Sequence, residues 1–141
     1  MCAAVVLPFI ARQGVAGTLL AAMRGLPAAE DPAHVLVPVR PALRAAHPLT
    51  PIEIDAAWRR ADGLPLDPWP RTHTRIGVEV LSCAPASQTL TATVAKRETW
   101  SGLALPSTGR YVIPGGLVPL QVDRENDRAT MVEPNIWVQH R

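Results

Sequence analysis

Residues 3–24 constrain the fold most, because they place an apolar run, a turn of small residues and an amphipathic segment in succession (AAVVLPFIARQGVAGTLLAAMR). This pattern predicts a β-strand over 3–10, a turn, and then an Ala/Leu-rich α-helix. A helix N-terminus presents unpaired backbone N–H groups and the positive end of the helix dipole, so a turn with Gly14, Ala16 and Gly17 can hold a pyrophosphate without any side chain. Gly17 has an alternative role, which is to allow close packing of the helix on a sheet.

A second β-branched run at 34–40 (HVLVPVR) predicts another strand, so the chain is expected to open with a βαβ unit. Crossovers of this kind are right-handed and make the two strands parallel. Pro8 and Pro38 cannot donate a ladder hydrogen bond. Each therefore marks either an interruption of strand pairing or the edge or end of a strand.

The middle of the chain predicts two helices. Thr50 and Glu53 have the spacing of a capping box, which predicts a helix over 51–60. Asp67 is followed by proline and predicts the N-cap of a second helix over 68–76.

Residues 78–140 are predicted to be mostly β-structure. The β-branched and aromatic runs predict antiparallel hairpins, with strands at 78–81, 89–94, 111–113, 117–122 and 131–138. Turn-forming residues predict the turns between them at 84–87, 106–109, 114–116 and 123–128. Residues 96–100 predict one helical turn. Residues 123–128 (DRENDR) predict a solvated turn, because six consecutive charged or amide side chains cannot all be buried. Its alternating acids lack the glycine and distal glutamate of a calcium loop, so no metal site is predicted.

The composition indicates one domain with neither a nucleic-acid partner nor a membrane span. The 141 residues, 48% of them hydrophobic, suffice for one core. Arginines are scattered and the net charge is only +2, which argues against nucleic acid. Cys2 and Cys83 form no disulfide framework, and the four histidines lack metal-ligand spacing. The N-terminal apolar run is too short to span a bilayer and has no basic n-region, so a cytoplasmic protein is expected.

Two resemblances point to one family. Ala11-Arg12-Gln13-Gly14-Val15-Ala16 resembles the acyl-CoA-binding motif Q/R-x-x-G-x-G/A of the GNAT (Gcn5-related) N-acetyltransferases at its fourth and sixth positions. Ala11 departs from the first position, where Arg12 and Gln13 could supply the lost polar contact. The rest of the chain resembles an actinobacterial group of acetyltransferase-like proteins through LTPIE, DGLPLDPW, RTHTRIG, GRYVIPGGLVP, VDRENDR and VEPNIWVQH. Together these resemblances imply one domain over 1–141 with a partial GNAT-like α/β (α+β) fold.

The resemblance also implies a site. It implies that strands 3–10 and 34–40 splay apart around the pantetheine arm of acetyl-CoA, and that its pyrophosphate is held by Arg12, Gln13, Gly14, Val15, Ala16 and Gly17. The family's tyrosine that protonates the departing CoA thiolate is absent from the predicted helix 68–76. His73 is the only group there that titrates near neutrality and is the candidate for this role, with a structural role as the alternative.

Three interpretations stay open. The first is an N-acetyltransferase that passes an acetyl group directly from acetyl-CoA to a small-molecule amine, with positioning supplying most of the rate. The second is a non-catalytic remnant or interaction module, because the chain begins inside the motif-bearing strand and lacks the hairpin, two helices and acid that the family places around it. Strand 3–10 would be an exposed apolar edge, so either the chain is an N-terminally truncated acetyltransferase, or a second copy of the chain or another protein completes the sheet. The third is an unrelated small α/β domain.

Overall fold

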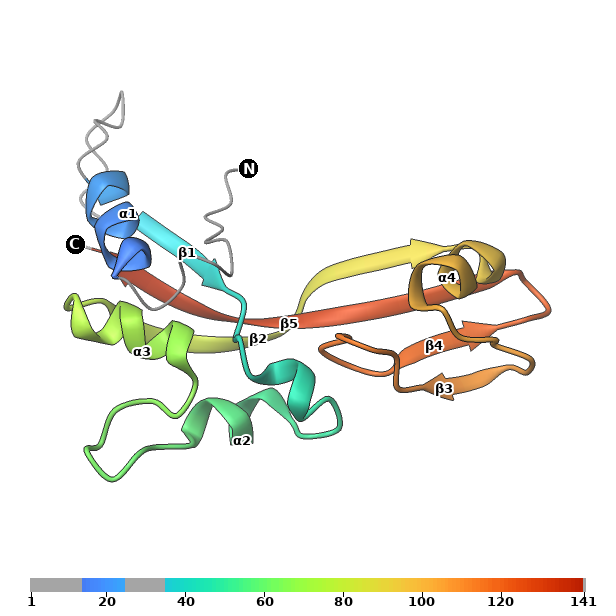
Figure 1. Cartoon of the computed structure of the whole chain (residues 1–141), viewed down its shortest axis with the longest axis horizontal. Helices are drawn as coiled ribbons and strands as arrows, with labels where there is room; N and C mark the ends of the chain where they lie inside the picture. The colour runs from blue at the N-terminus through green and yellow to red at the C-terminus, as the bar shows by residue number, and fades with distance from the viewer. Residues whose placement is uncertain (1–13, 25–34, 141) are drawn as a thin grey trace.

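The computed structural model describes residues 14–24 and 35–140 and combines helices with an antiparallel sheet (Figure 1). The helices are α1 (Val15–Arg24), α2 (Ile52–Ala57), α3 (Pro68–Arg75) and α4 (Val94–Ser101), with a 3₁₀ turn η2 (Arg44–Ala46). The strands are β1 (Val35–Val39), β2 (Glu79–Ala92), β3 (Gly109–Tyr111), β4 (Leu120–Asp123) and β5 (Arg128–His140). This arrangement confirms the predicted α+β class and agrees with a partial GNAT-like fold. The predicted strand 3–10, and with it the parallel βαβ pairing, lies outside the described residues.

Strand β5 organises the sheet and runs almost the full length of the molecule in Figure 1. β2 pairs with one edge of β5, from Ala129 to Gln139. The other edge is shared, because β1 pairs with residues 136–140 and β4 pairs with residues 128–130. β3 extends the sheet beyond β4, and every described pairing is antiparallel. Between these two partners, residues 131–135 of β5 pair with β2 on one edge and have no described strand beside them on the other.

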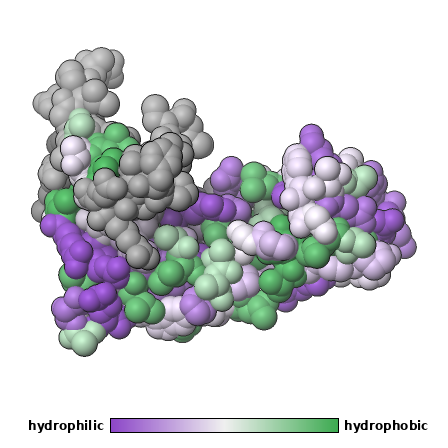
Figure 2. Space-filling model, in the orientation of Figure 1, coloured by the Kyte–Doolittle hydropathy of each residue, from purple (hydrophilic) through white to green (hydrophobic). Residues whose placement is uncertain are grey.

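Two hydrophobic clusters lie along β5. One joins α2, β1 and the start of β2 to the C-terminal half of β5 and contains Val39, Ile52, Val78, Ile136 and Val138. The other joins α4, β4 and the segment between α4 and β3 to the N-terminal half and contains Val94, Leu105, Leu120, Val122, Ala129 and Met131. The clusters thus occupy opposite ends of one long strand. Hydrophobic and hydrophilic residues are interspersed over the face seen in Figure 2.

Helix α3 and the turn before β5 confirm two local predictions. Asp67 caps α3 by accepting a hydrogen bond from the N–H of Trp69 at 2.8 Å. The helix ends near Gly77, which has the left-handed φ of +78° that favours glycine. Residues 124–127 form the turn between β4 and β5, as the DRENDR pattern predicts.

The predicted capping box at Thr50 is wrong. Pro51 is the N-cap of α2, and no side chain caps this helix. The N–H of Thr50 instead donates to the carbonyl of His47 at 3.1 Å, which keeps Thr50 in the preceding turn. The helix also stops at Ala57 rather than at 60, because Trp58 is extended and its carbonyl accepts a hydrogen bond from the N–H of Leu66 at 3.0 Å.

The predicted turn at 84–87 is also wrong. Both flanking runs belong to β2, since both pair with β5, and the sheet absorbs the residues between them as an irregularity from Ala84 to Gln88. Pro85 lies in this interval, where the ladder register shifts and no donor is required. The side-chain amide of Asn135 on β5 donates to the hydroxyl of Ser87 at 2.8 Å across it. Residue 94, predicted as the end of a strand, starts α4.

Candidate functional site

His73, the candidate proton donor, is buried on α3 with only 1% of its surface exposed. Its Nδ1 lies 3.2 Å from Nε2 of His140 at the end of β5. The ring of Trp69 contacts the imidazole edge-on, with 4.9 Å between ring centroids. Within the described residues Nε2 of His73 has no hydrogen-bond partner.

This environment sets the charge of His73. Removal from water, and then the neighbouring charge of His140, lowers the pKa of His73 to about 4. At pH 7 the imidazole is therefore neutral and does not offer an imidazolium proton. A buried, neutral imidazole fits a structural role for His73. Its catalytic role stays a prediction.

The start of α1 gathers four of the six residues predicted to bind the cofactor. Gly14 precedes the helix with a φ of +79°, and its carbonyl accepts the first helical hydrogen bond, from the N–H of Thr18 at 3.2 Å. The N–H groups of Val15, Ala16 and Gly17 precede that first donor and are the ones that a helix leaves unpaired. Arg12 and Gln13 lie outside the described residues.

Gly17 has open space around it. A Cβ atom built on Gly17 would meet nothing within 4 Å among the described residues. Close packing on described elements therefore does not require this glycine.

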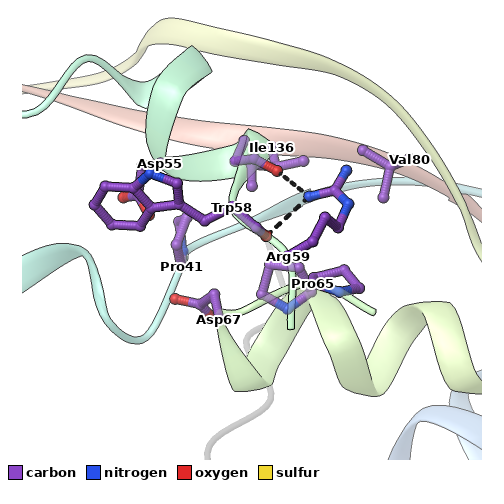
Figure 3. A pocket seen from close by; sticks show the side chains of 10 residues that line it. Pro41, Asp55, Trp58, Arg59, Pro65, Asp67, Val80 and Ile136 are labelled. Carbon is purple, nitrogen blue, oxygen red and sulfur yellow. Dashed lines mark hydrogen bonds between the residues drawn. The ribbon is translucent and has the colours of Figure 1, made fainter. Parts of the chain in front are cut away.

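A small pocket beneath α2 has a structural explanation (Figure 3). Its volume is about 20 Å³, the space of a water molecule, and its polar groups are already paired. Arg59 donates to the carbonyls of Ala56 at 2.6 Å and Trp58 at 3.0 Å. Asp55 pairs with Arg44, and Asp67 accepts from the N–H of Leu43 at 2.6 Å. These contacts give Arg59, Asp55 and Asp67 structural roles around the pocket.

A larger cleft lies between α4, the β3–β4 loop and the middle of β5. Its volume is about 200 Å³, and it lies where the edge of β5 opposite β2 has no described strand beside residues 131–135. The β3–β4 loop, which carries Gly115 and Gly116, points toward the centre of the molecule in Figure 1. Two buried charged residues, Arg97 and Glu133, line this cleft together with the exposed Trp100 at its rim.

The sequence left two roles open for Trp100, in a hydrophobic cleft or in the core, and it lines this cleft. Sequence reasoning missed the two charged residues. Arg97 falls in the segment predicted only as a helical turn, and Glu133 falls inside the predicted strand 131–138. The available signal was Glu133 itself, since a carboxylate in an otherwise apolar strand is buried only when something compensates its charge. The position of Arg97 opposite it depends on tertiary packing.

The described residues give no sign of a metal site or a membrane span. No cluster of three or more His, Cys, Asp or Glu residues suited to a metal occurs within 14–24 and 35–140. None of the helices in these ranges is long and apolar enough to cross a membrane.

Comparison with known proteins finds a similar enzyme. The chain is 32% identical over 147 aligned positions to arginine N-acetyltransferase avaD of Aspergillus versicolor. The match covers 92% of this chain and 51% of the fungal protein, so the chain spans about half the length of that curated relative. The similarity supports a relationship to acetyltransferases. No family model and no solved structure matches the chain.

Proposed function

We propose that this chain carries the acyl-CoA-binding part of a GNAT-type N-acetyltransferase, which transfers an acetyl group from acetyl-CoA directly to a small-molecule amine. The observation that carries the proposal is the similarity to a named N-acetyltransferase over 92% of the chain. The start of α1 supports it independently, because its N–H groups and open first turn suit an anionic pyrophosphate. The name of the relative makes arginine the first acceptor to test.

In the proposed reaction the unprotonated amine attacks the thioester carbonyl carbon, and the carbon–sulfur bond breaks as the new amide bond forms. The nitrogen of the new amide gives up one proton to the solvent, and the departing CoA thiolate takes one up. We retain His73 as the proposed donor to the thiolate. Because its pKa of about 4 leaves it neutral at pH 7, this role requires the bound cofactor to raise that pKa. A pH profile of kcat that differs between the wild type and His73→Gln would support the role, whereas a loss of stability alone would support the structural alternative.

Isothermal titration with acetyl-CoA and with free CoA tests the cofactor site, using Gly17→Glu and its neutral control Gly17→Gln. Both substitutions add similar bulk in the first turn of α1, and neither meets a described neighbour at Cβ. The positive end of the helix dipole stabilises a carboxylate at this position, so the acidic variant should fold. Gly14→Glu is a less clean variant, because the φ of +79° at Gly14 strains any side chain.

We expect micromolar binding by the wild type, and binding at least tenfold weaker in Gly17→Glu than in Gly17→Gln. That ratio isolates the effect of negative charge beside the pyrophosphate. Equal affinities for the two variants would place the pyrophosphate elsewhere. No binding by a folded, monodisperse wild-type sample would reject the acyltransferase and favour the non-catalytic module that pairs through strand 3–10.

A further inference from the structure

Arg97 is a buried cation without a counter-ion among the described residues. It is 8% exposed, one guanidinium nitrogen (Nη2) donates to the carbonyl of Leu90 at 2.9 Å, and another (Nη1) lies 3.8 Å from Sδ of Met131. Its Nε is buried with no partner in the described part of the chain. A buried positive charge without a partner destabilises the folded protein unless an anion binds beside it. The cleft beside Arg97 is where such an anion can reach it.

Glu133 is a buried anion that lines the same cleft. The residue is 6% exposed, and its Oε1 accepts a hydrogen bond from Arg40 at 3.3 Å. The side chain of Arg40 is 59% exposed, so this contact is of the weak, solvent-screened kind. The contact with Arg40 involves Oε1 alone, so it does not use the second carboxylate oxygen of Glu133. The carboxylate thus retains capacity for a second cation.

The two charges lie side by side and yet do not pair with each other. Met131, which contacts Arg97, is two residues before Glu133 on the same face of β5, a separation of roughly 7 Å along a strand. A carboxylate bound to Arg97 would be repelled by Glu133 unless the same molecule also carried a positive group. A ligand with only a positive group, bound to Glu133, would be repelled by Arg97. The arrangement therefore favours a ligand with both charges.

We propose that this cleft binds a free α-amino acid, with the ligand carboxylate on Arg97 and the ligand ammonium on Glu133. The cleft volume of about 200 Å³ is below the roughly 300–1,000 Å³ of sites for drug-sized molecules and suits a ligand of amino-acid size. Trp100 is 60% exposed at the rim, and its ring lies over Arg97, with 5.3 Å between the guanidinium carbon and the ring centroid, which helps to hold Arg97 in position.

The test is titration of the full chain without CoA, using L-arginine, agmatine and 5-guanidinopentanoic acid. Agmatine lacks the carboxylate and 5-guanidinopentanoic acid lacks the α-ammonium, while all three keep the guanidinium. The choice of arginine as probe rests on the proposed function, but the absence of CoA makes the result independent of the α1 site. We expect L-arginine to bind at least tenfold more tightly than either analogue.

Variants assign each charge to its partner. Arg97→Gln should weaken L-arginine and 5-guanidinopentanoic acid at least tenfold and leave agmatine unchanged. Glu133→Gln should weaken L-arginine and agmatine and leave 5-guanidinopentanoic acid unchanged. Arg40→Gln is the control, and it should not weaken L-arginine because it only removes a competitor for Glu133.

Several results would overturn the proposal. Purely structural roles for Arg97 and Glu133 would weaken all three ligands equally in each variant. Failure of folded wild-type protein to bind L-arginine, or equal affinity for the three ligands, would also reject it. If Arg97→Gln does not fold, Arg97→Lys keeps the charge without the planar fork and should weaken only the two carboxylate-bearing ligands.

Discussion

Nδ1 of His73 on α3 lies 3.2 Å from Nε2 of His140 on β5, so two imidazoles meet inside the fold. Burial is the larger of the two causes that lower the pKa of His73 from 6.5 to about 4, and the charge of His140 is the second. A neutral pair can share one proton in a hydrogen bond. A doubly protonated pair would place two positive charges in contact, which makes the site sensitive to acid.

The stability of the protein should fall as the pH drops from about 6.5 to about 4. In this window the unfolded chain protonates His73 and the folded chain does not, so protonation favours unfolding, by up to about 3 kcal/mol. Urea unfolding of the wild type and of His73→Gln at pH values across this window measures the effect. The variant should lose less stability than the wild type on acidification, and parallel curves would contradict the lowered pKa.

Loss of Asp55 should destabilise the fold strongly. Its Oδ2 lies 3.3 Å from Nη1 of Arg44, and the two side chains are only 3% and 4% exposed. Asp55→Ala strands a buried guanidinium, which costs about 3–5 kcal/mol in comparable pairs. Arg60→Ala, which breaks the exposed pair with Asp62, is the control and should leave the urea midpoint unchanged. Similar losses in both variants would mean that burial does not set the cost.

Asp67 should matter beyond a simple helix cap, because its two oxygens accept from two backbone N–H groups. One belongs to Trp69 in α3 and the other to Leu43, in the segment before η2. Asp67→Ala should lower the free energy of unfolding by about 2–3 kcal/mol, since a cap and a second backbone donor lose their partner together. Asp67→Asn keeps one acceptor oxygen and should lose less. A loss below 1 kcal/mol, as for an isolated cap in a peptide, would show that the bond to Leu43 contributes little.

Two glycines should respond in opposite directions to alanine. A Cβ on Gly116 would lie 2.8 Å from Cγ1 of Ile113 and 3.2 Å from its carbonyl oxygen, so Gly116→Ala should lose about 1–3 kcal/mol. Gly17 lies in α1 with no described atom within 4 Å of such a Cβ, so Gly17→Ala should gain about 0.5–1 kcal/mol. Thermal unfolding of the two variants without ligand compares them directly. A stabilised Gly116→Ala would show that the β3–β4 loop adjusts freely.

The parts of this fold that could be predicted are those determined by residues close together in the sequence. Asp67 followed by proline defines the start of α3, and the DRENDR run defines the turn before β5, because both depend on local hydrogen bonding and solvation. The segment 84–87 contains proline and small residues and predicts a turn, but pairing with β5 keeps it inside β2. Local signals cannot reveal a partner that lies some 50 residues away.

Of the two candidate sites, one could be predicted from local sequence and the other could not. The start of α1 follows from the glycines in its own turn, and α1 begins at Val15, directly after Gly14. The cleft depends on α4, the β3–β4 loop and β5, which come together only in three dimensions. Arg97 and Glu133 are 36 positions apart in the sequence, and no spacing rule connects them.

Strand β5 also dictates when this sheet can form during synthesis. Among the described strands β1 and β2 pair with β5 alone, and β4 pairs with β5 and the short β3, so most of the described pairing waits until residues 128–140 emerge from the ribosome. Pairing over such sequence separations is slow, and exposed edges invite association. Both hydrophobic clusters contain residues of β5, so neither is complete until this last described strand is in place.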